Sequence, residues 1–416
     1  MLSTMPDFPL TIGQIFDHGR LTYPDSEVVT AQADGARRVT FAALSERVER
    51  LAAGLRRLGV REGDRVATFA WNAQEHQEAY FAVPCMGAVL HTLNIRLFPE
   101  QLEYIIEHAQ DSVILLDASL APTLAPVLER VSSPRHVVVF GEGDRSQLRA
   151  PIEYEQLLAG EQPGYRWPAV DERDGAAMCY TSGTTGNPKG VVYSHRSSFL
   201  HSLGVCSGEC LALNERDRVL PVVPMFHANA WGLPYGGWMV GADLLLPSRF
   251  AQAAGIVRLI ASERATLAAA VPTVWHDVLA GGAHREQLSS LRAVMCGGAA
   301  VPRTLIEAYD QRFGVRMVQG WGMTETSPVA SLAFAPKTVA AQRGLDYRAT
   351  AGRPIAGVQA RIVDDAGEVL PRDGEAVGEL EVRGPWVTAS YYRDPAPEKF
   401  QDGWLRTGDV GSIDPL

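Results

Sequence analysis

Short strand-like runs alternate with helical segments along most of this chain, and that alternation limits the fold more than any other feature. Between the runs lie segments such as 99–109, where Leu102, Ile105 and Ile106 recur with helical spacing. Strands that alternate with helices predict α/β layers built on mostly parallel sheets. The predicted strands are 66–70, 113–116, 136–140, 176–180, 219–223, 244–246, 268–271, 293–296 and 317–319.

The pattern changes after about residue 350. Three short β runs, at 358–363, 378–382 and 404–407, are separated by turn signals that contain Asp and Gly, which predicts a small antiparallel, barrel-like unit. A length of 416 residues allows two or three domains. We therefore expect an α/β subdomain over 1–170, a second α/β subdomain over 171–345, and a small β subdomain over 346–416.

Composition excludes several classes of protein. A formal charge of −10 argues against a nucleic-acid groove, which needs clustered Lys and Arg. The five cysteines form no even disulfide framework and no zinc pattern, and the amino terminus lacks the features of a signal peptide, so we expect a reduced, cytoplasmic protein.

One long window could be mistaken for a membrane span, because His227 is the only side chain between Arg218 and Asp243 that can carry a charge near neutral pH. Repeated Pro and Gly would break a lipid-exposed helix there, so no transmembrane segment is predicted. A buried strand that runs into a loop lining an apolar cavity fits the window better, although any buried core has the same composition.

The stretch YTSGTTGNPKG, residues 180–190, combines glycines, short hydroxyl side chains and a single lysine, Lys189. Backbone N–H groups, hydroxyls and one cation suit a polyphosphate. The spacing rejects the P-loop, because Pro188 stands where its second glycine belongs and a β-favouring run follows in place of a helix. We expect a strand–loop–strand phosphate site; the alternative is an ordinary surface turn.

Four further stretches follow in order: PMFHANAW (224–231), CGGAAVP (296–302), QGWGMTET (319–326) and RTGD (406–409). With the glycine-rich loop, they resemble the adenylate-forming superfamily of acyl-CoA synthetases, aryl-CoA ligases, luciferases and peptide-synthetase adenylation domains. The stretches 79–97, 190–203 and 219–235 look most like bacterial medium- and long-chain fatty acyl-CoA synthetases. The resemblance covers essentially the entire chain.

The resemblance implies a nucleotide site for ATP. The loop residues would hold the β- and γ-phosphates, and two later segments would form the walls of the adenine slot. The residues alone allow a second interpretation, in which the first wall is a tight strand-to-helix turn and Trp321 is an aromatic residue of the core. The implied loop residues are Thr181, Ser182, Gly183, Thr184, Thr185 and Lys189; the first wall is Gly297, Gly298, Ala299 and Ala300; the second is Gln319, Gly320, Trp321, Gly322 and Thr324.

Two carboxylates and one hydroxyl complete the implied nucleotide site. Glu325, with Thr181, would bind Mg²⁺, since a hard cation prefers carboxylate, phosphate and water oxygens. Asp409 would accept hydrogen bonds from the ribose hydroxyls, although an ordinary hairpin Asp looks the same. Thr181, Lys189 and Glu325 are the implied catalytic residues.

The implied acyl site lies in the uncharged window, with Trp231 as a candidate gate over an apolar tunnel. A fatty chain gains about 0.8 kcal/mol per buried CH₂, so apolar walls suit it. The candidate residues are His227, Ala228, Trp231, Gly232 and Tyr235.

The implied reaction joins a fatty acid to AMP with release of pyrophosphate, and coenzyme A then takes the acyl group. The alternatives are an aryl- or short-acid ligase, transfer to a carrier protein, or a nucleotide-binding module without turnover. By family likeness, a homodimer is plausible. Family members continue into a small carboxy-terminal domain, so we expect this chain to be the large domain alone, weakly active or inactive overall.

Overall fold

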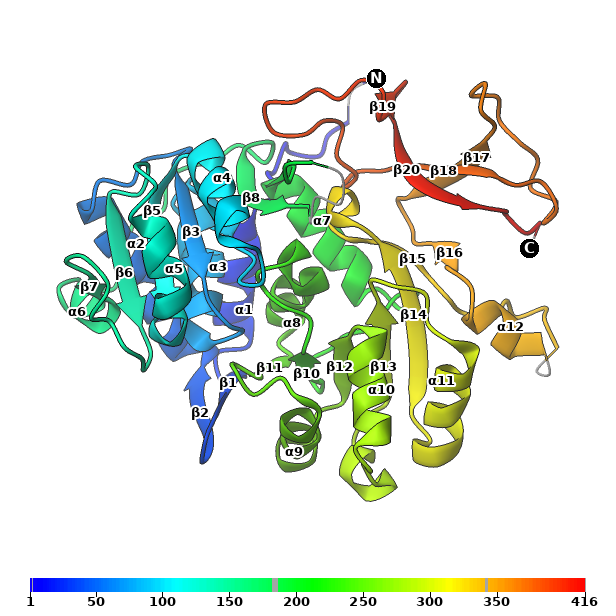
Figure 1. The fold of residues 1–416 in the computed structure, drawn as a ribbon, viewed down its shortest axis with the longest axis horizontal. Helices are drawn as coiled ribbons and strands as arrows, with labels where there is room; N and C mark the ends of the chain where they lie inside the picture. The colour runs from blue at the N-terminus through cyan, green and yellow to red at the C-terminus, as the bar shows by residue number, and fades with distance from the viewer. Residues whose placement is uncertain (2, 182–185, 341–342, 416) are drawn as a thin grey trace.

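The fold is seen in a computed structural model that describes residues 1, 3–181, 186–340 and 343–415 (Figure 1). Over these residues the strands form three sheets, two large and one small. The large sheets are mostly parallel and the small one is antiparallel, as the alternation of strands and helices predicts.

The first large sheet has seven strands within the described residues. All neighbours pair in parallel except the last two, which form the antiparallel pair on either side of the glycine-rich loop. In spatial order the strands are β7 (Ile152–Glu153), β6 (His136–Phe140), β5 (Asp111–Asp117), β3 (Arg65–Phe69), β4 (Val89–Thr92), β8 (Gly175–Tyr180) and β9 (Gly190–Ser194).

The second large sheet has nine strands in the part of the chain that the structure describes. Its six central strands are parallel, and antiparallel strands close both edges. In spatial order they are β16 (Arg353–Pro354), β15 (Val329–Leu332), β14 (Arg316–Gly322), β13 (Ala293–Gly297), β12 (Leu267–Ala270), β10 (Arg218–Pro221), β11 (Asp243–Leu246), β1 (Glu27–Gln32) and β2 (Gly35–Thr40).

Helices fill the space between the two large sheets and cover their outer faces (Figure 1). The buried side chains of the inner helices pack in one core with strands of both sheets. The inner helices are α1 (Ile12–Thr22), α2 (Phe41–Arg57), α3 (Gln74–Cys85), α6 (Tyr154–Ala159), α7 (His195–Cys206) and α8 (Leu233–Val240). The outer ones are α4 (Pro99–Ala109) and α5 (Ala121–Leu128) on the first sheet, and α9 (Ala253–Glu263), α10 (Pro272–Ala280) and α11 (Arg303–Ala308) on the second.

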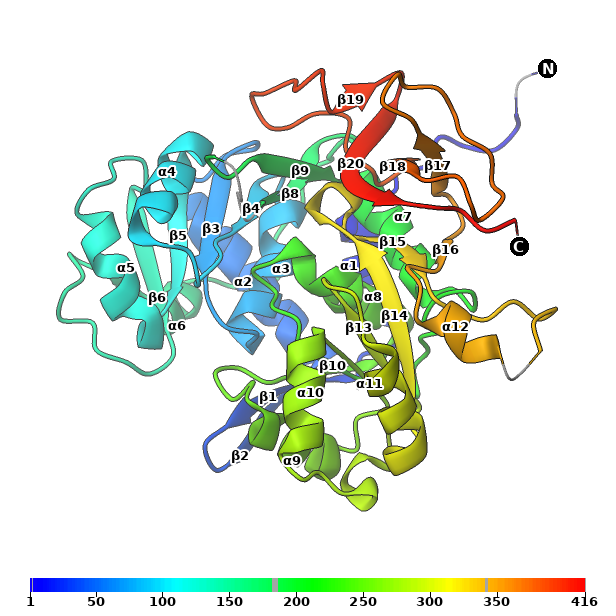
Figure 2. The same ribbon diagram turned by 45° about the vertical axis from the view of Figure 1, so that its right-hand side comes forward.

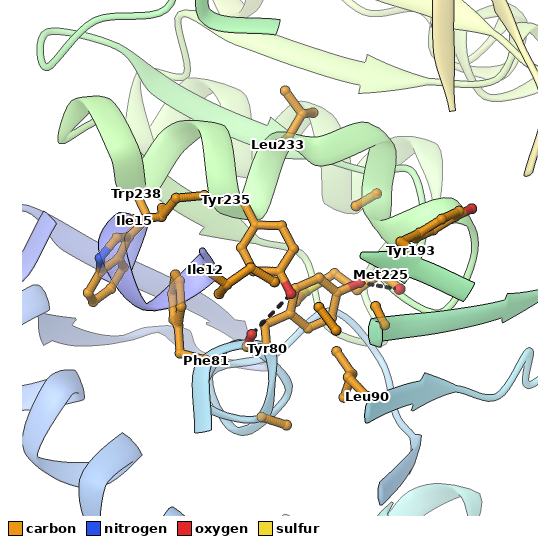
Figure 3. Close-up of a cluster of buried hydrophobic side chains, with 14 of the residues drawn as sticks. Ile12, Ile15, Tyr80, Phe81, Leu90, Tyr193, Met225, Leu233, Tyr235 and Trp238 are labelled. Carbon is orange, nitrogen blue, oxygen red and sulfur yellow. Dashed lines mark hydrogen bonds between the residues drawn. The ribbon is translucent and has the colours of Figure 1, made fainter. Parts of the chain in front are cut away.

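A group of large aromatic rings lies in the core between the sheets, among aliphatic side chains (Figure 3). The ring of Trp238 stacks on Phe41 with centroids 3.8 Å apart, and Phe81 lies 4.7 Å from the same indole. The hydroxyl of Tyr235 donates to the carbonyl of Tyr80, 3.0 Å away, so α8 is tied to α3 by polar as well as apolar contact. Large buried rings contribute much of the burial free energy of such a core.

The small antiparallel sheet lies beside the upper end of β14 in both views (Figures 1 and 2). Its order is β17 (Gln359–Val363), β18 (Gly378–Arg383), β20 (Trp404–Gly411) and β19 (Phe400–Gln401). A short helix, α12 (Gly344–Arg348), precedes it, and short helical turns lie at η1 (Ala118–Leu120), η2 (Ala228–Gly232), η3 (Arg285–Leu288), η4 (Tyr309–Phe313) and η5 (Thr324–Thr326).

The predicted fold class is confirmed. Helix α2 has Thr40 as its cap, with the Thr40 hydroxyl accepting from the N–H of Ala43 at 3.2 Å, and Gly59 follows with a φ of 86°. The subdomain boundaries at 170 and 345 stay a prediction: β8 and β9 join the first sheet, and β1 and β2 join the second. Among the described residues, no helix is long and apolar enough to cross a membrane.

Three buried histidines make the stability of this fold sensitive to acid. Burial lowers the pKa of His76 and His195 to about 4, and that of His201 to about 3. Below an unfolded pKa of about 6.5, the unfolded chain binds protons that these folded side chains do not. We predict that the free energy of unfolding falls as pH drops from 6.5 towards 4, by about 1.4 kcal/mol per pH unit for each histidine.

Chemical denaturation followed by circular dichroism over this pH range measures that slope. The variant His76→Gln should reduce the slope of unfolding free energy against pH by the contribution of one histidine. The variant His18→Gln, at an exposed position, should leave the slope unchanged. An identical slope in His76→Gln and the unmodified chain would contradict the assignment.

Candidate active site

A cavity lies at the carboxyl ends of the parallel strands of the second sheet, with about 390 Å³ of empty space that includes its opening to solvent. This edge is where ligands bind in open α/β sheets. The lining combines both predicted walls of the nucleotide slot with part of the uncharged window. It consists of His227, Ala228, Trp231, Met295, Gly297, Gly298, Gly320, Trp321, Gly322, Met323, Thr324, Pro328 and Val329.

The first wall is the end of β13. A Cβ on Gly297 would lie 2.6 Å from the carbonyl oxygen of Gly320 and 3.4 Å from the indole of Trp231, so only glycine allows both close approaches. Gly298 has a φ of 79°. Ala299 and Ala300 come next, are exposed, and do not belong to the described lining of the cavity.

The second wall is the end of β14 with the turn that follows. Gly320, Trp321, Gly322 and Thr324 all line the cavity. Gln319 does not belong to the described lining.

The side chain of Gln319 instead holds the surrounding chain in place. Its Oε1 accepts from the N–H of Val301 at 2.8 Å, and its Nε2 donates to the carbonyl of Thr350 at 2.6 Å. We assign this side chain a bracing role from its contacts, while a direct contact with nucleotide stays a prediction.

Asp409 reaches the second wall from the small sheet. The Nε1 of Trp321 donates to its Oδ2 at 2.8 Å, although the two residues are far apart in sequence. Asp409 itself is exposed. The small sheet therefore presents a carboxylate beside the aromatic side chain of the cavity, as a ribose-binding role requires.

The glycine-rich loop joins β8 to β9 in the predicted strand–loop–strand arrangement. Ser182, Gly183, Thr184 and Thr185 lie outside the described residues. The two described ends meet: the N–H of Thr181 donates to the carbonyl of Lys189 at 2.9 Å, and the Thr181 Oγ1 accepts from the N–H of Lys189 at 3.1 Å.

Lys189 and Glu325 are linked through one segment of the chain. The Nζ of Lys189 lies 3.1 Å from an oxygen of Asp394 and 4.7 Å from the centre of the Tyr391 ring. The Tyr391 hydroxyl donates to the Oε1 of Glu325 at 2.7 Å. Burial and the neighbouring Glu325 carboxylate raise the pKa of Tyr391, so this hydroxyl keeps its proton.

Glu325 is a buried carboxylate, only 5% exposed, next to the cavity-lining Thr324. Among the described residues, no group of three or more His, Cys, Asp or Glu side chains could hold a metal ion by itself. Mg²⁺ does not need such a cage, because it is usually bound by one or two carboxylates together with substrate phosphates and water. The side chains present therefore fit a metal ion that arrives with a nucleotide.

The uncharged window enters the cavity as an unusual turn, η2. Ala228, Asn229, Ala230 and Trp231 have φ values of 42°, 50°, 47° and 59°, and Gly232 follows at 76°. Non-glycine residues in this left-handed conformation cost roughly 1–2 kcal/mol each. The turn directs the Trp231 indole towards the glycines of the first wall.

The other acyl-site candidates divide into two groups. His227 and Ala228 line the cavity, and burial together with the positive charge of Arg96 lowers the pKa of His227. Gly232 and Tyr235 do not belong to its described lining. Tyr235 is buried in the core between the sheets, and a Cβ on Gly232 would meet the His201 ring at 2.6 Å.

Sequence reasoning missed several residues of this site. Met295, Pro328 and Val329 line the cavity beside the predicted motifs, and Met323 lines it from within the stretch QGWGMTET. Tyr391 and Asp394 were also missed; the only sequence signal is the polar, aromatic run SYYRD at 390–394.

Comparison with known proteins gives one family and close relatives. The family model described as AMP-binding enzyme matches residues 16–392. The chain is 41% identical to the medium-chain-fatty-acid–CoA ligase of Ectopseudomonas oleovorans, over 100% of this chain and 77% of the relative. It is 43% identical to the long-chain-fatty-acid–CoA ligase of Thermus thermophilus (99% and 76%) and 40% identical to the 3-methylmercaptopropionyl-CoA ligase of Ruegeria lacuscaerulensis (100% and 78%).

Solved structures agree with this result. The anthranilate CoA ligase AuaEII in complex with anthranoyl-AMP superposes with a TM-score of 0.87 at 25% identity, over 98% of this chain and 77% of that one. ATP-bound MatB from Rhodopseudomonas palustris gives 0.82 at 25% identity, with the same coverage. The chain spans about three quarters of the length of these curated relatives, and its expected weak activity stays a prediction.

Gly322 tests how tightly the second wall is built. A Cβ there would lie 1.8 Å from the carbonyl oxygen of Pro328, a backbone atom that cannot move without moving the turn. We predict that Gly322→Ala lowers the free energy of unfolding by about 2–4 kcal/mol. Gly411→Ala is the matched control, since its Cβ would meet nothing within 4 Å. Equal unfolding midpoints for the two variants in urea would contradict the packing described here.

Proposed function

This chain belongs to the AMP-binding enzyme family and is an AMP-forming acid–CoA ligase, and we propose that the acid it activates is a fatty acid. ATP and coenzyme A are its co-substrates. The observation that carries the proposal is the joining of two surfaces in one cavity: the small-residue nucleotide walls and the uncharged window around Trp231. The high identity to medium- and long-chain fatty acid–CoA ligases supports the same substrate class.

The first half-reaction forms acyl-AMP. An oxygen of the fatty acid carboxylate bonds to the α-phosphorus of ATP, and the bond from that phosphorus to the bridging oxygen of pyrophosphate breaks. The carboxylate is already ionised at neutral pH, so no general base is needed, and catalysis rests on positioning and charge neutralisation. This accounts for a site made of glycines, hydroxyls, one lysine and one carboxylate.

Each group has a proposed task in that step. Lys189 and the loop from Thr181 hold the β- and γ-phosphates, and Thr324 lies next to the α-phosphate. The adenine ring lies between the wall at Gly298 and the wall at Trp321, and Asp409 accepts from the ribose hydroxyls. Glu325, with Thr181, would hold Mg²⁺, which neutralises phosphate charge when it is bound.

In the second half-reaction the sulfur of coenzyme A bonds to the acyl carbon and AMP leaves. The carboxylate resists nucleophiles until its oxygen becomes part of a good leaving group, which explains the two steps. The thiol proton passes to solvent. Transfer to a carrier protein in place of coenzyme A is the alternative acceptor.

The acyl chain is proposed to lie against the Trp231 side of the cavity. Ala228 and Trp231 are apolar, and burial together with the charge of Arg96 lowers the pKa of His227, so this wall carries no charge near neutral pH. Each CH₂ buried there contributes about 0.8 kcal/mol of binding free energy. Trp231 is the proposed gate, because its indole lines the cavity and contacts the glycine wall.

Other acids are the runner-up substrates. One relative is named for 3-methylmercaptopropionate, and a feruloyl-CoA synthase from Amycolatopsis is 35% identical over 92% of this chain. The homodimer and the cytoplasmic location both stay predictions.

Acid-dependent exchange of labelled pyrophosphate into ATP tests the proposed substrate class. With saturated acids from C4 to C18, cinnamate and 3-methylmercaptopropionate, we predict the highest kcat/KM for a saturated acid of medium or long chain. The reason is the increase in burial free energy with each CH₂. A preference for cinnamate or the sulfur-containing acid would overturn the fatty acid proposal, and no exchange with any acid would overturn activation itself.

Glu325→Gln tests the metal-binding role at nearly constant shape, because the amide oxygen can still accept from Tyr391. We predict a loss of about 100-fold in kcat for exchange, the size expected when one electrostatic contact to the transition state is removed. Glu142→Gln, at an exposed position, is the matched control. Full activity of Glu325→Gln at every Mg²⁺ concentration would exclude the role.

A further inference from the structure

One segment outside the expected motifs contacts both Lys189 and Glu325. It is the loop 388–394, between β18 and β19, which we name the clasp. We propose that Asp394 of the clasp occupies Lys189 in place of a nucleotide phosphate, and that Tyr391 couples Lys189 to Glu325 as a positioning residue. The inference rests on the proposed function, since it assumes that Lys189 binds the phosphates of ATP.

Among the described residues, the Lys189 ammonium has two partners, and both come from the clasp. Its Nζ lies 3.1 Å from Asp394 Oδ2, and it stands over the Tyr391 ring at 4.7 Å from the centroid. Among the described residues, Asp394 is the only carboxylate within ion-pair distance of this ammonium. The hydrogen bond from Lys189, with help from the N–H of Ala396, lowers the pKa of Asp394 and keeps the carboxylate ionised.

Tyr391 continues the connection to the proposed metal ligand. Its hydroxyl donates to Glu325 Oε1 at 2.7 Å, and its ring face receives the Lys189 ammonium. One side chain therefore fixes the distance between the cation and the carboxylate. The backbone helps, because the N–H of Thr388 donates to the carbonyl of Glu325 at 2.8 Å.

The clasp is also held by the first sheet and by the end of helix α4. The N–H of Tyr392 donates to the carbonyl of Gly190, next to Lys189, at 2.7 Å. The guanidinium of Arg393 donates to the carbonyl of His108 at 3.1 Å and to the side chain of Gln110 at 2.8 Å. The clasp thus connects the small sheet to the end of the glycine-rich loop, and these contacts hold it beside Lys189.

The ion pair is suited to exchange. The side chains of Lys189 and Asp394 remain 41% and 46% exposed, and ion pairs this exposed to water are weak. A polyphosphate carries more charge than one carboxylate, so it can displace Asp394 from the ammonium. Tyr391 contacts the side chains of Lys189 and Glu325 and no backbone atom of the glycine-rich loop among the described residues. These contacts can therefore persist after phosphate has displaced Asp394 from Lys189.

Asp394→Asn tests the competition directly. The affinity for ATP, measured by calorimetry in the absence of a fatty acid, should increase by about two- to five-fold, because the competing carboxylate is gone. The increase is expected both with and without Mg²⁺. In a Lys189→Met background, the same substitution should change the affinity by less than about 1.5-fold. Asp365→Asn, which removes the same charge from the exposed turn after β17, is the control and should leave the affinity unchanged.

Tyr391→Phe tests the positioning role separately, since it keeps the ring over Lys189 and removes the bond to Glu325. The Mg²⁺ concentration needed for half-maximal exchange should rise by about ten-fold, while ATP affinity without Mg²⁺ stays within two-fold. Tyr104→Phe removes a hydroxyl that has no hydrogen-bond partner among the described residues and serves as the matched control. Circular dichroism and the unfolding midpoint check that each variant is folded.

The outcomes separate this inference from the proposed function. Unchanged ATP affinity in Asp394→Asn, or an equal gain with and without Lys189, overturns the competition. An unchanged Mg²⁺ requirement in Tyr391→Phe overturns the positioning role. Tight ATP binding without pyrophosphate exchange overturns the proposed function alone, and an unmodified chain that binds no ATP overturns both.

Discussion

The cavity depends on hydrogen bonds from Asn72, which hold the chain after β10 between the two large sheets. The Asn72 amide donates to the carbonyls of Pro221 and Val223 at 2.8 and 2.9 Å, and its oxygen accepts from the N–H of Met225 at 2.7 Å. Asn72 follows a strand of the first sheet, whereas β10 belongs to the second. Because Asn72 is buried, an unmade bond there would cost the full desolvation of a polar group. The relative position of the sheets at their carboxyl edges is thus fixed where the cavity opens.

Because Asn72 fixes the chain after β10, the strained turn at 228–232 starts from a fixed position. Four consecutive non-glycine residues adopt positive φ there, at a cost on the order of several kcal/mol. Surrounding contacts must offset it: the Tyr80 hydroxyl donates to the Met225 carbonyl and to the Asn229 side chain, and the Cys179 thiol donates to the same Asn229 oxygen. The strain is located where Trp231 meets the glycine wall, which is where a change of conformation would alter access to the cavity.

Local patterns in the sequence predicted the elements well, because periodicity, caps and turn residues act over a few positions. Thr40 and Gly59 bound their helix as expected, and the loop before Lys189 lies between two strands. Pairings across the chain were not predictable in this way: β1 lies against β11, and the bonds of Tyr391 to Glu325 and of Trp321 to Asp409 join distant segments. Gln319 and Tyr235 show the same limit, since only tertiary contacts reveal that their polar groups are used by neighbouring backbone.

The negative charge of the protein opposes the binding of a polyphosphate. The protein carries a formal charge of −10, and Glu325, Asp394 and Asp409 bring three carboxylates to the site, where Lys189 supplies the ammonium beside the glycine-rich loop. Free ATP would therefore meet net electrostatic repulsion. Salt weakens this repulsion by screening the exposed charges. Removing Asp394 from Lys189 and placing a divalent cation between Glu325 and the phosphates both reverse the balance locally. The groups that contact the nucleotide must therefore supply its affinity against the repulsion of the acidic surface.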